Sequence, residues 1–358
     1  MSGIFGALNL SDTDRSYINT IGQGVVYDAA KSLLDQYNAS LNAAMSALVE
    51  RQTSDFKLRY KLPGGGRLQR RGGRAESGAV KATGKWDIAL PLEDFGNQLA
   101  GDDVAIAYMT IDEFDRHLDT VFIQDRNTVR QEILKAIFNN TERTFVDEIN
   151  GSLLVEPLAN GDAVLFPPVS GSESEATDDH YLESGYAASS ITDTNNPVAT
   201  IVDELEEHFG GGTQGGSALV VFINKAQRAK IEALTGFSKI EQRFVTLDSQ
   251  DIADRGVPNV PGKIIGYVSG AWISVWDWIP ANYMVGIHLE APAPLLMRVD
   301  PTETGLDQGL VLVAEDLEYP FRKSHYRHRF GVGVGNRLNG VVMELGTGGT
   351  YSIPSGFA

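Results

Sequence analysis

Residues 110–150 read TIDEFDRHLDTVFIQDRNTVRQEILKAIFNNTERTFVDEIN, a run without proline or glycine. Thr110 stands three positions before Glu113, the pattern of a capping box that satisfies backbone donors at a helix start. Apolar side chains then recur at helical spacing, at Ile111, Phe114, Leu118, Phe122, Val129, Ile133, Ile137, Phe145 and Ile149. The stretch predicts a helix about 60 Å long, at roughly 1.5 Å per residue, with 125–128 as the expected point of a kink or break. Such a helix suits a scaffold on which other layers pack, rather than the wall of a catalytic pocket.

Composition excludes several classes of protein. The chain has 358 residues, of which 42% are hydrophobic, and this allows one to three globular domains. It contains no cysteine, which excludes disulfides, thiolate metal sites and cysteine nucleophiles. The N-terminus lacks the basic flank and apolar core of a signal peptide. The most apolar region, 264–289, is interrupted by polar residues and proline, so it predicts strands rather than a membrane span. We therefore expect a soluble cytoplasmic protein without membrane contact.

Charge is distributed unevenly along the chain. The formal net charge is −17, yet residues 55–85 hold nine Lys or Arg against two acids, which is +7 locally and leaves −24 elsewhere. The nine cations are Lys57, Arg59, Lys61, Arg67, Arg70, Arg71, Arg74, Lys81 and Lys85. Such asymmetry predicts a charged partner for the basic segment. That partner is either nucleic acid or the acidic surface of another copy of the chain.

The basic segment has the pattern of a long hairpin. Residues 56–62 alternate apolar and cationic side chains, a glycine-rich tip follows, and residues 80–92 return as a second strand. An isolated hairpin is marginal in water, so we expect this one to lie against something. Three interpretations stay open: a loop without a partner, an arm that binds nucleic acid without sequence preference, and docking on acidic faces of sister subunits. The acidic run GSESEATDDHYLES at 171–184 offers such a face.

The rest of the chain predicts helices and strands in alternation. Residues 14–51 have a weakly apolar helical pattern, split near Gly22 and Gly24, and residues 153–197 form short strand-like pieces. From 198 to 317 the pattern predicts a small mixed α/β domain, with helices at 198–209 and 224–234, the latter capped by Asn224, and strands at 218–223, 263–268, 271–276, 283–289 and 309–313. Residues 319–345 are again rich in predicted strand.

No motif supports catalysis or nucleotide binding. The glycine clusters GGGTQGG (210–216) and GVGVGN (331–336) lack the Lys-Ser/Thr ending of a P-loop and the G-x-G-x-x-G spacing. His325 and His328 lie three apart in a predicted strand, so they face opposite sides and do not favour a metal site. No Ser-His-Asp or H-E-x-x-H arrangement occurs. We expect no catalytic residue, no cofactor and no metal, and so no enzyme.

Two further groups of residues have a chemical and a structural interpretation. The sequence Asp178-Asp179-His180 lies in an acidic loop where a cation could bind, but a solvated turn is the simpler interpretation. Trp272, Trp276 and Trp278 could stack on a ligand, but the shared parity of the first two favours packing in a core. We expect both groups to be structural.

The order of elements resembles that of bacteriophage major capsid proteins of the Hong Kong 97-type fold. The likeness covers nearly the whole chain, and the closing run YRHRFGVGVGNRL (326–338), followed by GVVM (340–343), is similar to the last strands of that family's peripheral domain. The resemblance implies an α+β fold made of five parts: an N-terminal arm and helix (1–54), an extended β-hairpin loop (55–95), a peripheral domain with the long spine helix (96–197), an α/β axial domain (198–317) and returning strands of the peripheral domain (318–358).

The resemblance also implies a function. It predicts a structural subunit that self-assembles into hexamers and pentamers of an icosahedral head. Such a head encloses double-stranded DNA without sequence-specific binding, forms in the host bacterial cytoplasm and becomes the virion. The nine loop cations would be inter-subunit contacts. Only about fifty residues precede the hairpin, which leaves no room for a large fused scaffolding segment. The expected partners are a portal and a decoration protein. Scaffolding is expected to come from a separate protein, if one is used at all.

Some members of the family carry a Lys–Asn isopeptide cross-link. The candidate amines here are Lys57, Lys61, Lys81 and Lys85, and the candidate amides are Asn336 and Asn339, upstream of Glu344. No motif selects among them, so we do not expect a cross-link.

Two alternatives to a phage head stay open. An encapsulin-like nanocompartment shell resembles the same fold but encloses protein cargo. A nucleic-acid-binding protein would use Arg67, Arg70, Arg71 and Arg74 as contacts and would bind DNA with strong salt dependence.

Overall fold

The computed structural model describes residue 17 and residues 23–61, 85–102, 108–210, 218–240, 260–316 and 321–358. The chain divides into two compact units, each assembled from three stretches of sequence. Unit 1 consists of Met1–Ala43, Leu92–Glu132 and Val299–Gly331, and unit 2 consists of Ala44–Pro91, Ile133–Arg298 and Val332–Ala358. No described helix is both long and apolar enough to cross a membrane.

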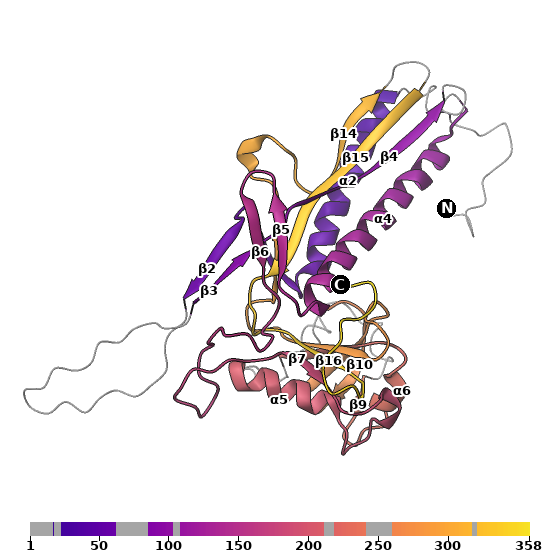
Figure 1. Ribbon diagram of the computed structural model, residues 1–358. Coiled ribbons are helices and arrows are strands. Elements are labelled where there is room, and N and C mark those ends of the chain that lie inside the picture. The colour runs from indigo at the N-terminus through magenta and orange to yellow at the C-terminus, as the bar shows by residue number, and fades with distance from the viewer. Residues whose placement is uncertain are drawn as a thin grey trace, which may run out of the picture. The chain divides into compact units, whose positions relative to one another are not determined.

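The described residues form an α+β fold, as the sequence predicts (Figure 1). The helices are α2 (Gln23–Met45), α4 (Ile111–Phe138), α5 (Pro197–Phe209) and α6 (Arg228–Ile231), with 3-10 turns at Ala188–Ser190 and Thr302–Thr304. The strands are β1 (Val49–Thr53), β2 (Lys57–Lys61), β3 (Lys85–Ala89), β4 (Glu93–Asp102), β5 (Arg143–Asp147), β6 (Gly151–Val155), β7 (Tyr181–Glu183), β8 (Leu219–Ile223), β9 (Ser238–Lys239), β10 (Lys263–Val268), β11 (Ala271–Val275), β12 (Tyr283–His288), β13 (Leu295–Arg298), β14 (Leu310–Asp316), β15 (Phe321–Val334) and β16 (Val341–Glu344).

Unit 1 is built on long antiparallel strands and two long helices (Figure 1). β15 pairs with β4 from Phe321↔Asp102 to Phe330↔Glu93, and with β14 on its other side. Helices α2 and α4 meet where the rings of Tyr37 and Phe122 stack with centroids 4.6 Å apart.

A buried carboxylate ties the helices of unit 1 to its sheet. Asp125 on α4 accepts a hydrogen bond from the Tyr37 hydroxyl at 2.7 Å, and its other oxygen lies 2.7 Å from His328 Nδ1 on β15. The expected break at 125–128 is wrong, since α4 is one continuous helix. The helix runs unbroken because Asp125 finds its partners across the core and the Thr128 hydroxyl donates to the Gln124 carbonyl at 3.0 Å within the helix.

The start of α4 is confirmed, but its expected end is wrong. The Glu113 backbone N–H donates to Thr110 Oγ1 at 3.3 Å, as a capping box requires. The helix ends at Phe138 rather than at Asn150. Asn139 Oδ1 then accepts from the backbone and hydroxyl of Thr141, and the chain turns into the antiparallel hairpin β5–β6.

Unit 2 contains a seven-stranded mixed sheet in the order β7-β16-β12-β8-β11-β10-β9. Every residue of β8 is buried, since the strand is parallel to β11 on one side and antiparallel to β12 on the other. The prediction that residues 309–313 form a strand of this sheet is wrong. As part of β14 this segment pairs with β15, while β7 and β16 extend the sheet instead.

Helix α5 covers the middle of this sheet. Asn196 caps it, because its side-chain oxygen accepts from the backbone of Val198 at 3.1 Å and of Ala199 at 3.3 Å. Its apolar face packs on β12, β16 and β8, and the approach is close: a Cβ placed on Gly286 of β12 would lie 2.2 Å from Ile201 Cγ2.

We predict that Gly286→Ala lowers the free energy of unfolding by about 1–3 kcal/mol, because overpacking forces the helix and the sheet apart. Urea denaturation followed by circular dichroism measures this. Gly348→Ala is the matched control, since the nearest atom to its added Cβ would be 3.9 Å away. Equal stability of the two variants would contradict the close packing of α5 on β12.

Candidate functional site

The β2–β3 ribbon has one face that packs on unit 2 and one that carries charge. The strands pair from Lys57↔Ala89 to Lys61↔Lys85, which confirms the base of the hairpin expected at 56–62 and 80–92. Trp86 and Ile88 are buried, and the Trp86 ring lies 5.3 Å from that of Phe166. The ribbon is therefore held by its apolar face. Such packing is needed because a two-stranded hairpin alone is only marginally stable in water.

The charged face of the ribbon is partly neutralised by its own carboxylate. Asp87 forms a bidentate ion pair with Arg59, in which Arg59 NH2 lies 2.7 Å from Asp87 Oδ2. The same carboxylate lies 3.3 Å from Lys57 Nζ. The hydrogen bond from Arg59 holds the pKa of Asp87 well below its usual range, against a smaller opposing effect of burial. The same bond raises the pKa of Arg59. Two of the nine predicted contact cations are thus already paired within the chain.

The other seven predicted contact residues are only partly covered by the structure. Lys61 and Lys85 face each other at the last described pair of the ribbon, though their side chains lie outside the described residues. Arg67, Arg70, Arg71, Arg74 and Lys81 lie wholly outside the described residues. Their role as contacts between subunits stays a prediction.

A second ribbon, β5–β6 (Figure 1), carries exposed apolar side chains on its outer face and at its tip. Leu153 and Val155 point inward and are buried, whereas Val146 is 74% exposed and Ile149 at the tip is 90% exposed. This surface was not predicted, because Phe145 and Ile149 continue the helical spacing of α4. The signal that could have found it is the Asn150-Gly151 pair, a strong hairpin-turn sequence, and Gly151 indeed has φ of 76°.

A buried aspartate fixes the tip of this second ribbon. Asp147 Oδ1 accepts from the backbone N–H groups of Ile149 at 2.9 Å and Asn150 at 2.8 Å, and Oδ2 lies 2.8 Å from Arg298 NH1. Arg298 also donates to the Leu90 carbonyl at 2.9 Å. Burial works against ionisation of Asp147, but the two N–H groups and Arg298 outweigh it and lower the pKa of Asp147.

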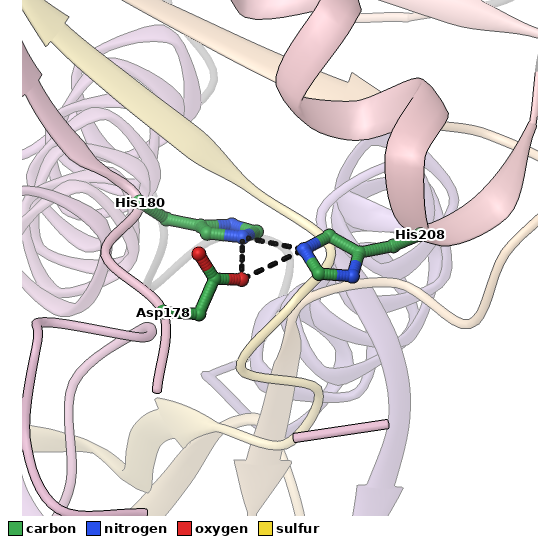
Figure 2. A group of neighbouring side chains, drawn as sticks. All are labelled: Asp178, His180 and His208. Carbon is green, nitrogen blue, oxygen red and sulfur yellow. Dashed lines mark hydrogen bonds and ion pairs between the residues drawn. The ribbon is translucent and has the colours of Figure 1, made fainter. Parts of the chain in front are cut away.

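A third group, unlike the outer faces of the two ribbons, is largely buried. Asp178, His180 and His208 point toward one another, with His180 fully buried (Figure 2). The interpretation of 178–180 as a solvated turn is therefore wrong for His180. Its ring is enclosed because Nδ1 lies 2.8 Å from the Gly340 carbonyl and Nε2 lies 3.0 Å from Asp178 Oδ2. Since His208 comes 28 residues later on α5, no local pattern could have found the group.

The remaining candidates from the sequence behave as structural residues. In β15, His328 is buried on Asp125 while His325 faces the other side, as predicted. Trp276 is buried against Phe222, and Trp272 packs on Tyr267. These contacts confirm core packing for Trp276, whereas Trp272 is only half-buried.

The two candidate cross-link amides are engaged within unit 2. Asn339 is fully buried, accepts from the His288 N–H at 2.8 Å and donates to the carbonyls of His288 and Pro292. The Asn336 amide also donates to Pro292 O, at 3.0 Å.

Comparison with known proteins shows a likeness of fold. No protein-family model matches the sequence, and no curated protein matches it. A chain from Mycobacterium phage Patience superposes with a TM-score of 0.67 at 20% sequence identity, covering 100% of this chain and 98% of that one. A chain of the mature capsid of bacteriophage PhiM1 superposes with a TM-score of 0.51 at 9% identity, over 96% and 91%. The Hong Kong 97-type fold expected from the sequence is confirmed.

We predict that Asp147→Asn is less stable than the natural chain at pH 7, by about 1–3 kcal/mol, because Arg298 loses its charged partner. The difference should shrink as the pH falls. The folded-state pKa of Asp147 is lowered, so its stabilisation is complete above about 3.9, the usual pKa of aspartate, and is lost on acidification through the folded-state value. Urea denaturation between pH 7 and 3 measures it. Glu148→Gln, at the exposed neighbour, is the control, and a pH-independent difference would contradict the assignment.

Proposed function

We propose that this chain is the major capsid subunit of a bacteriophage and self-assembles into the hexamers and pentamers of an icosahedral head that encloses double-stranded DNA. The observation that carries the proposal is the likeness of fold to the Mycobacterium phage Patience chain, which spans the full length of this chain. The likeness to a chain of the PhiM1 mature capsid supports it further. The role is structural, with no catalytic chemistry assigned to any residue.

The two ribbons supply surfaces of the kind that assembly needs. Each ribbon buries one face within unit 2 and leaves the other outward. The outward face carries Lys57 and Arg59 on β2–β3, and the exposed Val146 and Leu154 on β5–β6. Exposed apolar patches on a protein surface mark interaction sites. In a closed shell the same heterologous contact is repeated around each symmetry axis. Many weak contacts per subunit then add up to a stable lattice.

Charge supports docking on sister subunits rather than on DNA. Outside residues 55–85 the chain carries a net charge of −24, so the body repels a nucleic acid that it encloses. Lys57 and Arg59 are occupied by Asp87, which leaves the cations of the loop beyond them for an acidic face of a neighbouring copy. The acidic run 171–184 is a suitable receptor, since Glu173 and Asp179 are exposed.

The proposal extends to partners and location. The subunit would assemble in the cytoplasm of a bacterial host, around a portal and with a separate scaffolding protein, and would end in the virion with or without a decoration protein. An encapsulin-like compartment is the alternative. The contents of purified particles separate the two, because a phage head holds nucleic acid and a nanocompartment holds protein cargo.

We predict that Ile149→Ser raises the protein concentration needed for assembly at least tenfold, because each subunit loses an apolar contact repeated throughout the shell. The unfolding free energy should change by less than about 0.5 kcal/mol, as for other exposed positions. Light scattering against concentration measures assembly. Glu148→Ser, at the adjacent exposed position, should assemble normally. Unchanged assembly of the Ile149 variant would remove β5–β6 from the proposed contacts.

We predict that the unassembled chain shows no strong binding to a random DNA duplex at 50 mM salt in a gel-shift experiment. A nucleic-acid-binding protein that uses the four loop arginines would bind there and would lose affinity steeply by 200 mM salt. Replacing Arg67, Arg70, Arg71 and Arg74 by serine should impair assembly without altering DNA affinity. Normal assembly together with weaker DNA binding by this variant would instead make the loop a nucleic-acid-binding arm.

A further inference from the structure

Three potential ligand atoms converge at one largely buried point of unit 2 (Figure 2). His208 Nε2 lies 2.7 Å from Asp178 Oδ2, His180 Nε2 lies 3.0 Å from the same oxygen, and the two Nε2 atoms are 3.2 Å apart. In a tetrahedral zinc site with bonds of about 2.1 Å, neighbouring ligand atoms are about 3.4 Å apart. The triangle is slightly tighter than one face of that tetrahedron, and small side-chain rotations would open it to fit.

The ring of His180 is oriented as a metal ligand is. Its Nδ1 lies 2.8 Å from the Gly340 carbonyl, which can only accept, so Nδ1 carries the proton and donates. In the neutral ring the Nε2 lone pair then faces Asp178 Oδ2. Histidine ligands of metals are commonly fixed in this way, with the second ring nitrogen donating to a carbonyl. Two facing lone pairs at 3.0 Å repel each other unless a cation, either a proton or a metal ion, lies between them.

The surroundings favour a divalent cation over a proton alone. Carboxylate oxygens of Glu204 and Glu207 gather with that of Asp178, and Glu207 Oε1 lies 3.5 Å from His208 Nε2. Both glutamates and His208 lie toward the C-terminal end of α5, where the helix dipole favours positive charge. Two imidazoles with carboxylates are a donor set that zinc accepts in a four-coordinate site.

We propose that Asp178, His180 and His208 bind one Zn²⁺ ion, with Glu204, Glu207 or a water molecule as the fourth ligand. The ion would tie the segment that precedes β7 to the C-terminal end of α5. It would therefore stabilise the folded seven-stranded sheet unit, because an ion bound only by the native state shifts the unfolding equilibrium. This inference stands on the cluster and does not depend on whether the chain forms shells.

The full-length chain, stripped with a chelator, tests the proposal in three ways. Titration calorimetry should show one zinc ion bound per chain. Zinc at about a hundred times its dissociation constant should raise the melting temperature by about 5 °C. Cobalt(II) used in place of zinc should give the intense visible absorption of a tetrahedral site.

Variants separate this site from adventitious binding. His208→Gln removes one donor with a neutral side chain of similar length, and zinc affinity should fall at least a hundredfold. His325→Gln, which removes a histidine of unit 1 outside the cluster, should bind as the natural chain does. Should His208→Gln not fold, the cobalt spectrum of the natural chain decides alone.

Two results would overturn the proposal. One is the absence of both the cobalt absorption and the zinc-dependent rise in melting temperature in the natural chain. The other is equal zinc affinity of the natural chain and His208→Gln. A melting temperature that varies with pH but not with zinc is a case of the first result. It would mean that the cluster shares a proton and does not bind a metal ion.

Discussion

The burial of Trp86 and Ile88 in the core of unit 2 is the constraint on which the proposed function depends. A two-stranded ribbon has no core of its own, so it is stable only if one face is buried. Trp86 meets Tyr60 and Phe166, and Ile88 is fully buried beside Leu90. Because this face is held, the side chains of Lys57 and Arg59 are directed outward. The same design recurs in β5–β6, where Asp147 and Arg298 fix the tip.

The buried ionic groups show how the fold places polar chemistry where sequence separation is large. Arg337, fully buried, donates to the carbonyl of Pro157 at 2.8 Å and pairs with Asp162 at 2.8 Å, which ties the loop after β6 to the last strands. Asp125 does the same for α2, α4 and β15 in unit 1. Removing one partner of such a pair leaves a buried charge, so each of them fixes one arrangement of its segments.

Much of the fold could be predicted from local patterns, and the errors have physical causes. The start of α4, the helix at 198–209 and the buried strand at 218–223 follow from capping residues and apolar spacing. The end of α4 was missed because Phe145 and Ile149 keep its period, although the strand alternation and Asn150-Gly151 outweigh them. β4 was missed because its largely exposed, polar side chains carry no alternation, and its pairing with β15 is tertiary. The base of the basic hairpin was predictable, whereas Asp178, His180 and His208 meet only through the packing of α5, and no spacing rule anticipates that.

Electron microscopy of the purified chain, with size-exclusion chromatography alongside, tests the central claim most directly. We expect closed shells, or rings of five and six subunits. Shells isolated from an infected or co-expressing host should contain nucleic acid. A monodisperse monomer that also fails to assemble when its genomic neighbour, a scaffolding protein, is supplied would contradict it.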